Sequence, residues 1–188
     1  NAGGLGVLAS DTVIEEGMSL ASLEETTENA LRVILPPAAS SHNPVDVLGD
    51  APMQRYQEAL TLIAKDSGVD MILIIVTPQS MTEAVATAEA ILTFRQTSTI
   101  PLVAAFAGHD SFQEAVALLT PHVATYTMAE AGAKALGSLY KLSRIQQEKE
   151  SRKNPLSTPE KRPSPENART IIQEALAKKQ SQLLPIEV

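Results

Sequence analysis

Residues 70–76 read DMILIIV, a continuous apolar run that polar residues bound on both sides. Such a run is typical of a strand that is buried on both faces of a parallel sheet. Further along the chain, IPLVAAF at residues 100–106 and VATY at residues 123–126 predict two more strands. Apolar residues at helical spacing predict helices around these strands, over residues 5–16, 24–34, 52–66, 81–96, 111–119 and 128–147.

Local signals predict where some of these helices begin and end. Gly17 suits a C-terminal cap, because glycine readily adopts the left-handed conformation found there. Asp50 is the expected N-cap of the third helix, with Pro52 in its first turn. Leu35-Pro36-Pro37 ends the second helix. Residues 18–23 are expected to form a short strand or a connection.

Strands that alternate with helices predict an α/β protein, a parallel sheet covered by helices on both sides in three layers. Ligands of such folds bind at the carboxyl ends of the strands. The loops at those ends are residues 1–6, 43–50, 77–80 and 107–110. We therefore expect four segments that are far apart in sequence to meet at one edge of the sheet.

The first eleven residues, NAGGLGVLASD, form a glycine-rich turn that runs directly into a helix-like segment. The first amides of a helix lack intrahelical acceptors, and glycines let a ligand come close to the backbone, so the turn is a candidate phosphate site. A tight strand-to-helix turn without a ligand explains these eleven residues equally well.

Both ends of the sequence suggest a piece of a larger protein. A strand is expected before the glycine turn, so the first strand of the sheet is taken to be missing. Residues 148–164 are charged and rich in proline and predict a flexible linker. Residues 165–188 regain helical spacing and end in apolar residues with nothing local to bury them.

The composition excludes several classes of function. The 188 residues include no cysteine, which excludes disulfides, thiolate metal sites and thiol catalysis. Residues 1–140 carry 5 basic and 16 acidic side chains, a net charge of −11, which argues against nucleic-acid binding. No apolar run is long enough to span a membrane, and we expect a cytoplasmic protein.

Four motifs at the expected strand ends resemble one family. They are NAGGLGVLASD at residues 1–11, LPPAASSHNPVDVLGDA at 35–51, TPQSMTEAV at 77–85 and VAAFAG at 103–108. Together they resemble the succinyl-CoA-synthetase-like, flavodoxin-like domain of the NDP-forming acyl-CoA synthetases, which include the ADP-forming acetyl-CoA synthetases. The resemblance implies a doubly wound sheet over residues 1–147, and it makes residues 165–188 the helical lead-in to an ATP-grasp domain.

The resemblance also implies a reaction and partners. The family converts an acid, CoA and ATP to acyl-CoA, ADP and phosphate through a phosphohistidine, so the whole protein would be an acid–thiol ligase. CoA, ATP or ADP and Mg²⁺ are expected for that protein, and no cofactor for this segment alone. Its partners would be CoA-binding, phosphohistidine-bearing and ATP-grasp domains, in an oligomer. The segment by itself is expected to be inactive.

The family's site residues carry over to two groups of positions. Asn1, Gly3, Gly4 and Gly6 match the turn at the head of a helix whose N-terminus faces the phosphohistidine. Asn43 and Asp46 in the second loop, and Thr77 and Gln79 in the third, are possible further site residues without an assigned role. Asp46 is expected either to orient the glycine turn or to serve its own loop.

None of the three histidines is expected to be the nucleophile, because the resemblance places that residue in another domain. His42 follows two serines in the second loop, and His109 and His122 are expected at the surface. No histidine pair shows metal-ligand spacing.

Two other hypotheses compete with the synthetase. One makes the region a noncatalytic sensor or scaffold of a protein lysine acetyltransferase with ligase-like domains. The other is a flavodoxin-like flavin or nucleotide binder, which the low aromatic content of 3% disfavours.

Overall fold

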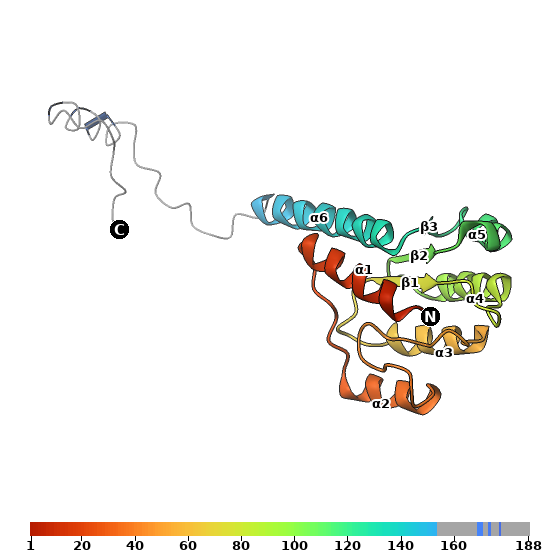
Figure 1. Ribbon diagram of the computed structural model, residues 1–188. Helices are drawn as coiled ribbons and strands as arrows, with labels where there is room; N and C mark the ends of the chain where they lie inside the picture. The colour runs from red at the N-terminus through yellow and green to blue at the C-terminus, as the bar shows by residue number, and fades with distance from the viewer. Residues whose placement is uncertain (154–168, 171–172, 174–176, 178–188) are drawn as a thin grey trace. The chain divides into compact units, whose positions relative to one another are not determined.

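The computed structural model describes residues 1–153, 169, 170, 173 and 177 (Figure 1). The chain divides into two compact units, Asn1–Arg144 and Ile145–Val188, and the first contains the whole sheet. Most of the expected linker, and most of residues 165–188, lie outside the described residues.

Three parallel strands, β1 (Ile72–Val76), β2 (Leu102–Phe106) and β3 (Ala124–Tyr126), form a sheet in the order β1-β2-β3. Ile72 pairs with Leu102, and Val103 pairs with Ala124. The three strands expected from the sequence are confirmed, each slightly shorter than its apolar run. The sheet is open, and among the described residues one edge of β1 has no neighbouring strand.

Six α-helices surround the sheet in the described part of the chain. They are α1 (Gly3–Glu15), α2 (Glu25–Ile34), α3 (Met53–Ile63), α4 (Ala84–Thr97), α5 (Gln113–Leu119) and α6 (Ala129–Lys153), with a short 3₁₀ helix, η1 (His109–Ser111), before α5. Residues 18–23 contain no strand and form a connection. α6 continues past the expected end at residue 147, so the first part of the expected linker is helical.

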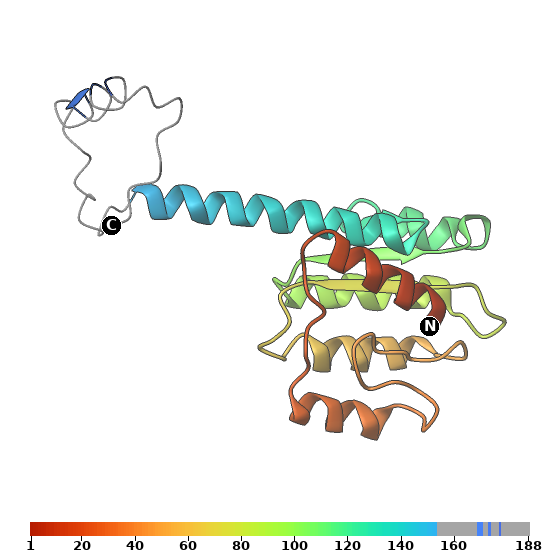
Figure 2. The ribbon, with the colours of Figure 1, turned by 60° about the vertical axis from the view of Figure 1, so that its left-hand side comes forward.

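The helices cover both faces of the sheet, as the α/β pattern predicts (Figures 1 and 2). On one face, Leu5 and Ala9 of α1 and Ala129 of α6 pack against Leu73 and Ile75. The other face carries the larger core, in which Ile72, Ile74 and Val76 pack with side chains of α2, α3, α4 and α5; these include Leu31, Leu60, Ile91 and Leu119. Burial of these aliphatic side chains is the main stabilising contribution to the fold.

Two helix ends differ in how well the sequence predicted them. Gly17 has φ +82°, and the amides of Gly17 and Met18 bond to the carbonyls of Ile14 and Val13, which confirms a glycine C-cap in a Schellman motif. The prediction of Asp50 as N-cap of α3 is wrong. Pro52 occupies the N-cap, and the amide of Met53 donates instead to Glu83 at 3.1 Å.

α4 begins at Ala84, three residues after the expected start at residue 81. Thr82 accounts for the delay, because its hydroxyl accepts a bond from the Gln79 amide at 3.0 Å and donates to the Thr77 carbonyl at 3.1 Å. These bonds close a turn that competes with helix formation. The third loop is thereby held against the end of β1.

None of the helices in the described residues has the length and apolar content needed to cross a membrane.

Candidate functional site

The four loops lie together at the carboxyl edge of the sheet, although among the described residues only 77–80 and 107–110 follow strands, β1 and β2; residues 43–50 connect α2 to α3. A Cβ atom added to Gly3 would lie 3.0 Å from Oδ2 of Asp46, and one added to Gly6 would lie 3.5 Å from Pro44. These contacts join the glycine turn to the second loop. We call the four loops, residues 1–6, 43–50, 77–80 and 107–110, the edge loops.

The remaining contacts extend the cluster to the third and fourth loops. Gly49 lies against the Gln79 side chain: a Cβ atom added to Gly49 would be 3.5 Å from Cγ of Gln79. Gly108, with φ +121°, approaches Pro78 so closely that an added Cβ would be 2.6 Å from the proline ring. A side chain does not fit at Gly108, and this explains a glycine at the turn after β2.

Asn1 is the main tie between the glycine turn and β1. Its Oδ1 accepts a bond from the Thr77 amide at 2.7 Å, and its Nδ2 donates to the Thr77 carbonyl at 3.1 Å. Its terminal nitrogen donates to the carbonyl of Ile75 at 3.1 Å. The side chain of Asn1 is thus used to position the turn and is directed at Thr77.

The N-terminus of α1 is open to a ligand. The first helical bond runs from Gly6 to Ala2 at 3.0 Å, so the amides of Gly3, Gly4 and Leu5 have no acceptor in the helix. No side chain caps this end, and no acidic residue lies in the first turn. A Cβ atom added to Gly4 meets nothing within 4 Å, so the face of the turn at Gly4 is accessible.

Asp46 stabilises its own loop, which was one of the two expected roles. Its Oδ1 accepts a bond from the Leu48 amide at 2.9 Å, and Leu48 has a φ of 68°, a conformation that costs energy in a leucine. Oδ2 lies beside Gly3. The carboxylate therefore sits on the Gly3 side of the helix end and leaves the Gly4 side free.

Burial changes the ionisation of two groups around the cluster. It lowers the pKa of the Asn1 amine to about 6, and the charge of Asp46 offsets part of that shift. Burial also raises the pKa of the Tyr56 hydroxyl well above its ordinary value, to which the charge of Asp46 adds. Tyr56 therefore stays protonated and donates to the Ile75 carbonyl at 3.4 Å.

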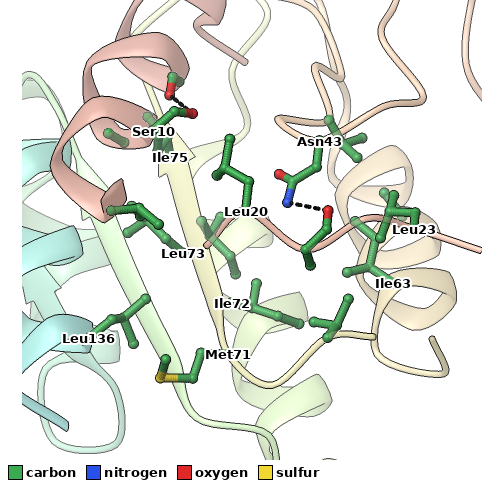
Figure 3. A pocket seen from close by; sticks show the side chains of 18 of the residues that line it. Ser10, Leu20, Leu23, Asn43, Ile63, Met71, Ile72, Leu73, Ile75 and Leu136 are labelled. Atoms are coloured by element: carbon green, nitrogen blue, oxygen red, sulfur yellow. Dashed lines mark hydrogen bonds between the residues drawn. The ribbon is translucent and has the colours of Figure 1, made fainter. Parts of the chain in front are cut away.

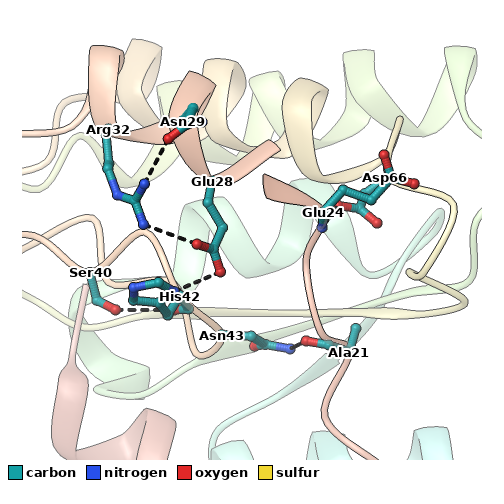
Figure 4. A network of polar contacts seen from close by, with 9 residues as sticks. All are labelled: Ala21, Glu24, Glu28, Asn29, Arg32, Ser40, His42, Asn43 and Asp66. Atoms are coloured by element: carbon teal, nitrogen blue, oxygen red, sulfur yellow. Dashed lines mark hydrogen bonds and ion pairs between the residues drawn. The ribbon is translucent and has the colours of Figure 1, made fainter. Parts of the chain in front are cut away.

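The side chains of Asn43 and His42 bond to segments outside the edge loops (Figure 4). Asn43 donates to the carbonyl of Ala21 at 3.1 Å. His42 is exposed, and its Nδ1 lies 2.6 Å from Oε1 of Glu28, which also pairs with Arg32 at 3.0 Å. The sequence did not suggest the His42–Glu28 contact, because the residues lie on different segments and follow no periodic pattern.

His122 is exposed, and the side chain of His109 lies outside what the structure describes. Among the described residues, no three His, Asp or Glu side chains gather in a way that could hold a metal ion.

The fold and the edge loops define a class: an open parallel α/β domain that presents a helix N-terminus at the carboxyl edge of its sheet, an arrangement suited to anions. The sequence profile of the Ligase-CoA domain matches residues 1–148, and the chain belongs to this family. The resemblance noted in the sequence is therefore confirmed at the level of the family.

Two relatives of this chain are named as ADP-forming acetate–CoA ligases. The chain is similar to the ADP-forming acetate–CoA ligase of Methanocaldococcus jannaschii, with 37% identity over 148 residues, which cover 76% of this chain and 21% of that protein. It is 32% identical to the alpha subunit of ADP-forming acetate–CoA ligase I of Pyrococcus furiosus, covering 77% of this chain and 32% of the subunit. The chain thus spans a third or less of these relatives.

Solved structures agree with the fold. The dinucleotide forming acetyl-coenzyme A synthetase 1 of Ca. Korarchaeum cryptofilum, in complex with phosphate and ADP, matches with a TM-score of 0.73 at 27% identity; the match covers 78% of this chain and 32% of that one. PH0766 of Pyrococcus horikoshii matches with a TM-score of 0.70 at 33% identity, over 74% and 33% of the two chains. The names of the relatives bear out the synthetase prediction and give no support to the acetyltransferase alternative.

Proposed function

We propose that this chain is part of an ADP-forming acyl-CoA synthetase and supplies a phosphate site at the N-terminus of α1. Residues 1–147 would form the domain that carries the site, residues 148–164 a linker, and residues 165–188 the lead-in to an ATP-grasp domain. CoA, ATP and Mg²⁺ would be used by the whole protein, together with its CoA-binding and phosphohistidine-bearing domains. The names of the relatives support this proposal.

The observation that carries the site is the uncapped first turn of α1, which lies where four loops meet. The amides of Gly3, Gly4 and Leu5 lack helical acceptors, and the helix dipole adds positive potential there. Donors that are already oriented stabilise the charge of a phosphoryl group without further rearrangement. Asn1 and Asp46 would position the turn, and Gly4 would be the side from which phosphate approaches.

The phosphate site is tested by titrating inorganic phosphate into the ¹⁵N-labelled chain and following the amide signals of Gly3, Gly4 and Leu5. A pH of 8 is suitable, because the Asn1 amine, with its pKa of about 6, is then uncharged and cannot attract the anion by itself. These three signals are expected to shift with phosphate, and less with chloride at equal ionic strength. Their failure to respond selectively would contradict the site.

A pair of valine substitutions separates the site from the rest of the helix. Gly4→Val is expected to weaken phosphate binding at least tenfold, since the new side chain covers the accessible amides while meeting no other residue. Leu8→Val places a valine one turn further along α1, where Leu8 is 47% exposed, and should leave binding unchanged. In the complete synthetase, Gly4→Val should stop phosphoenzyme formation and leave CoA binding intact.

A further inference from the structure

Exposed large apolar side chains gather on α1 and α6, the two helices that cover one face of the sheet. On α1, Val7, Leu8 and Ile14 are 57%, 47% and 58% exposed, and on α6 Leu142 is 50% exposed. Among the described residues, the four helices on the other face carry two such side chains between them, one on α2 and one on α5. Single exposed apolar residues are ordinary, whereas a concentration of them marks an interaction surface.

The outer side of α1 is apolar although its inner side is already used. Ala9 is buried against the sheet. Another side of the helix, which carries Ser10, borders a cavity of about 420 Å³ beside β1 (Figure 3). Val7 and Ile14 are two turns apart, so they share a third side, which is exposed. A helix that is apolar on its inner and outer sides is typical of one that is covered from both.

α1 and α6 lie side by side, so their outer sides form one surface (Figures 1 and 2). A Cβ atom added to Gly137 of α6 would be 2.7 Å from Cβ of Glu16 in α1, and Nζ of Lys141 lies 2.5 Å from Oε2 of Glu16. We call the outer helix face a set of exposed residues that recur every three or four positions on the two helices: Val7, Leu8, Asp11, Ile14 and Glu15 of α1, with Lys134, Ser138, Lys141 and Leu142 of α6. All of them belong to the unit Asn1–Arg144.

The outer helix face is acidic on one helix and basic on the other. α1 contributes Asp11 and Glu15, and its sequence, GGLGVLASDTVIE, contains no basic residue. α6 contributes Lys134 and Lys141. Lys141 pairs with Glu16 in the same chain, but Asp11, Glu15 and Lys134 have no ion-pair partner within the described residues. The two halves of the face therefore carry opposite charges that are not matched inside one copy.

We propose that the outer helix face is the contact between two copies of this chain, with α1 of each copy packed on α6 of the other. In a two-fold contact every interaction occurs twice, so a face with one acidic and one basic helix is complementary to itself. Val7, Ile14 and Leu142 form its apolar centre. Burial of these side chains supplies the affinity, and the charges select this arrangement over α1 on α1, which would bring like charges together.

The size of the face predicts a weak dimer. The 13 residues of α1 form a helix about 20 Å long, and two helices about 10 Å wide give on the order of 400 Å² for each copy. A standard protein–protein interface buries about 800 Å² for each partner. We therefore expect a Kd on the order of 100 μM. The outer helix face does not include Gly4 or the edge loops, so the dimer does not depend on the proposed phosphate site.

The contact is tested by sedimentation of the 188-residue chain from about 10 μM to about 1 mM, a range that brackets the expected Kd. The average mass should rise from that of a monomer towards that of a dimer. A chain that is still monomeric at the highest concentration would overturn the proposal.

Exchanging the charges tests the pairing of α1 with α6. Asp11→Lys with Glu15→Lys makes both helices basic on the outer helix face, and Lys134→Glu with Ser138→Glu makes both acidic. Each variant alone should dimerise at least tenfold more weakly than the wild type. An equimolar mixture should recover dimerisation, because the basic helices of one variant meet the acidic helices of the other. A mixture no better than the separate variants would contradict the pairing.

A matched control separates the face from net charge. Glu58→Lys with Glu114→Lys adds the same charge as the first variant, but at exposed positions of α3 and α5, on the other side of the sheet. This control should dimerise like the wild type. An equal loss in the control would mean that net charge, and not the outer helix face, governs association.

Cross-linking tests the same contact without changing a charge, and it decides the matter if a charge variant folds poorly. The chain contains no cysteine, so single cysteines report unambiguously. With oxidised glutathione present, Ile14→Cys mixed with Leu142→Cys should form a disulfide-linked heterodimer at least tenfold faster than Ile14→Cys alone forms a homodimer. Equal rates would show that α1 of one copy does not lie on α6 of the other, and would overturn the proposal.

Discussion

Gly3 and Gly4 are neighbours with the same side chain, yet the structure gives them different surroundings. An added Cβ at Gly3 lies 3.0 Å from Oδ2 of Asp46, whose other oxygen is held by the Leu48 amide at 2.9 Å. An added Cβ at Gly4 meets nothing within 4 Å. Gly3 is thus required for close packing of the second loop, whereas Gly4 leaves space that a ligand could occupy.

Alanine substitutions should therefore separate the two glycines. Gly4→Ala is expected to raise the free energy of unfolding by up to about 1 kcal/mol, the usual gain of alanine over glycine in a helix. Gly3→Ala should lose that gain and lower the free energy of unfolding by about 0.5 to 1 kcal/mol, because Asp46 must move. Urea unfolding of both variants measures the difference, and equal stabilisation by the two would contradict this account of Gly3.

At the scale of single residues, the sequence predicted which residues form the glycine turn, but not which residues they contact. The glycine turn and its place before a helix could be predicted from the three glycines, because backbone freedom is a property of the residue itself. The partner of Asn1 and the contact between Gly3 and Asp46 could not be predicted, since both depend on how the loops pack in space. Asp50 shows the limit of local rules: an aspartate before a proline is a good N-cap signal, but it bonds Arg55 at 2.8 Å instead.

At the scale of elements, the start of α2 is anchored by Asp66, which lies in the connection between α3 and β1. Asp66 is 4% exposed, and its Oδ2 accepts a bond from the amide of Glu24, the N-cap residue of α2, at 2.8 Å. Its Oδ1 accepts from the Gly68 amide at 2.9 Å. Burial alone would raise the pKa of Asp66, but these bonds and one from Thr27 lower it below its ordinary value.

Asp66→Asn is expected to lower the free energy of unfolding at pH 7 by about 1 to 2 kcal/mol, because the charged acceptor of two amides is lost. The lowered pKa means that the contribution of Asp66 is complete above its unfolded pKa of about 4 and is lost as the pH falls through its folded pKa. The difference between wild type and variant should therefore shrink as the pH falls below 4. Urea unfolding at pH 7 and pH 3 checks this.

Asp70→Asn is the matched control, because Asp70 is exposed and, like Asp66, lies in the connection between α3 and β1. It should have little effect at either pH. A loss at Asp70 as large as that at Asp66, or a loss at Asp66 that persists undiminished at pH 3, would rule out the anchoring role.

Element boundaries show why sequence rules work in part. β1 and β2 lie inside their apolar runs, and α2 stops at its prolines, because these limits follow from local chemistry. The start of α4 depends on Thr82 bonding to Gln79 and Thr77 across the turn. Such a competing turn has no periodic signature in the sequence.

At the scale of the molecule, the edge loops hold together segments that are far apart along the chain. Parallel topology places the loops after β1 and β2 at one edge, so the meeting of residues 77–80 and 107–110 could be predicted. Residues 43–50 connect α2 to α3, and their place at this edge depends on packing. Which residues join them depends on the packed structure. Asn1 and Thr77 are 76 residues apart and are connected through an amide, a carbonyl and a hydroxyl of Thr77.

Asn1→Ala should therefore loosen α1 from the sheet. It removes the acceptor of the Thr77 amide and a donor to the Thr77 carbonyl, which leaves a half-buried amide without its partner. The expected loss is about 1 to 3 kcal/mol in the free energy of unfolding. Hydrogen exchange should also become faster along α1, while the amides of β2 change only as far as global stability does.

Asn29→Ala is the matched control, since Asn29 is exposed on α2 and accepts one bond from Arg32 at 2.7 Å. Alanine has the higher helix propensity, so this variant should be neutral or slightly more stable. The tie between Asn1 and Thr77 predicts a difference between the two variants that is concentrated in α1. If Asn1→Ala instead accelerated exchange evenly over α1 and α2, the glycine turn would be held by the packing of Leu5 and Ala9 on the sheet, and not by the amide of Asn1.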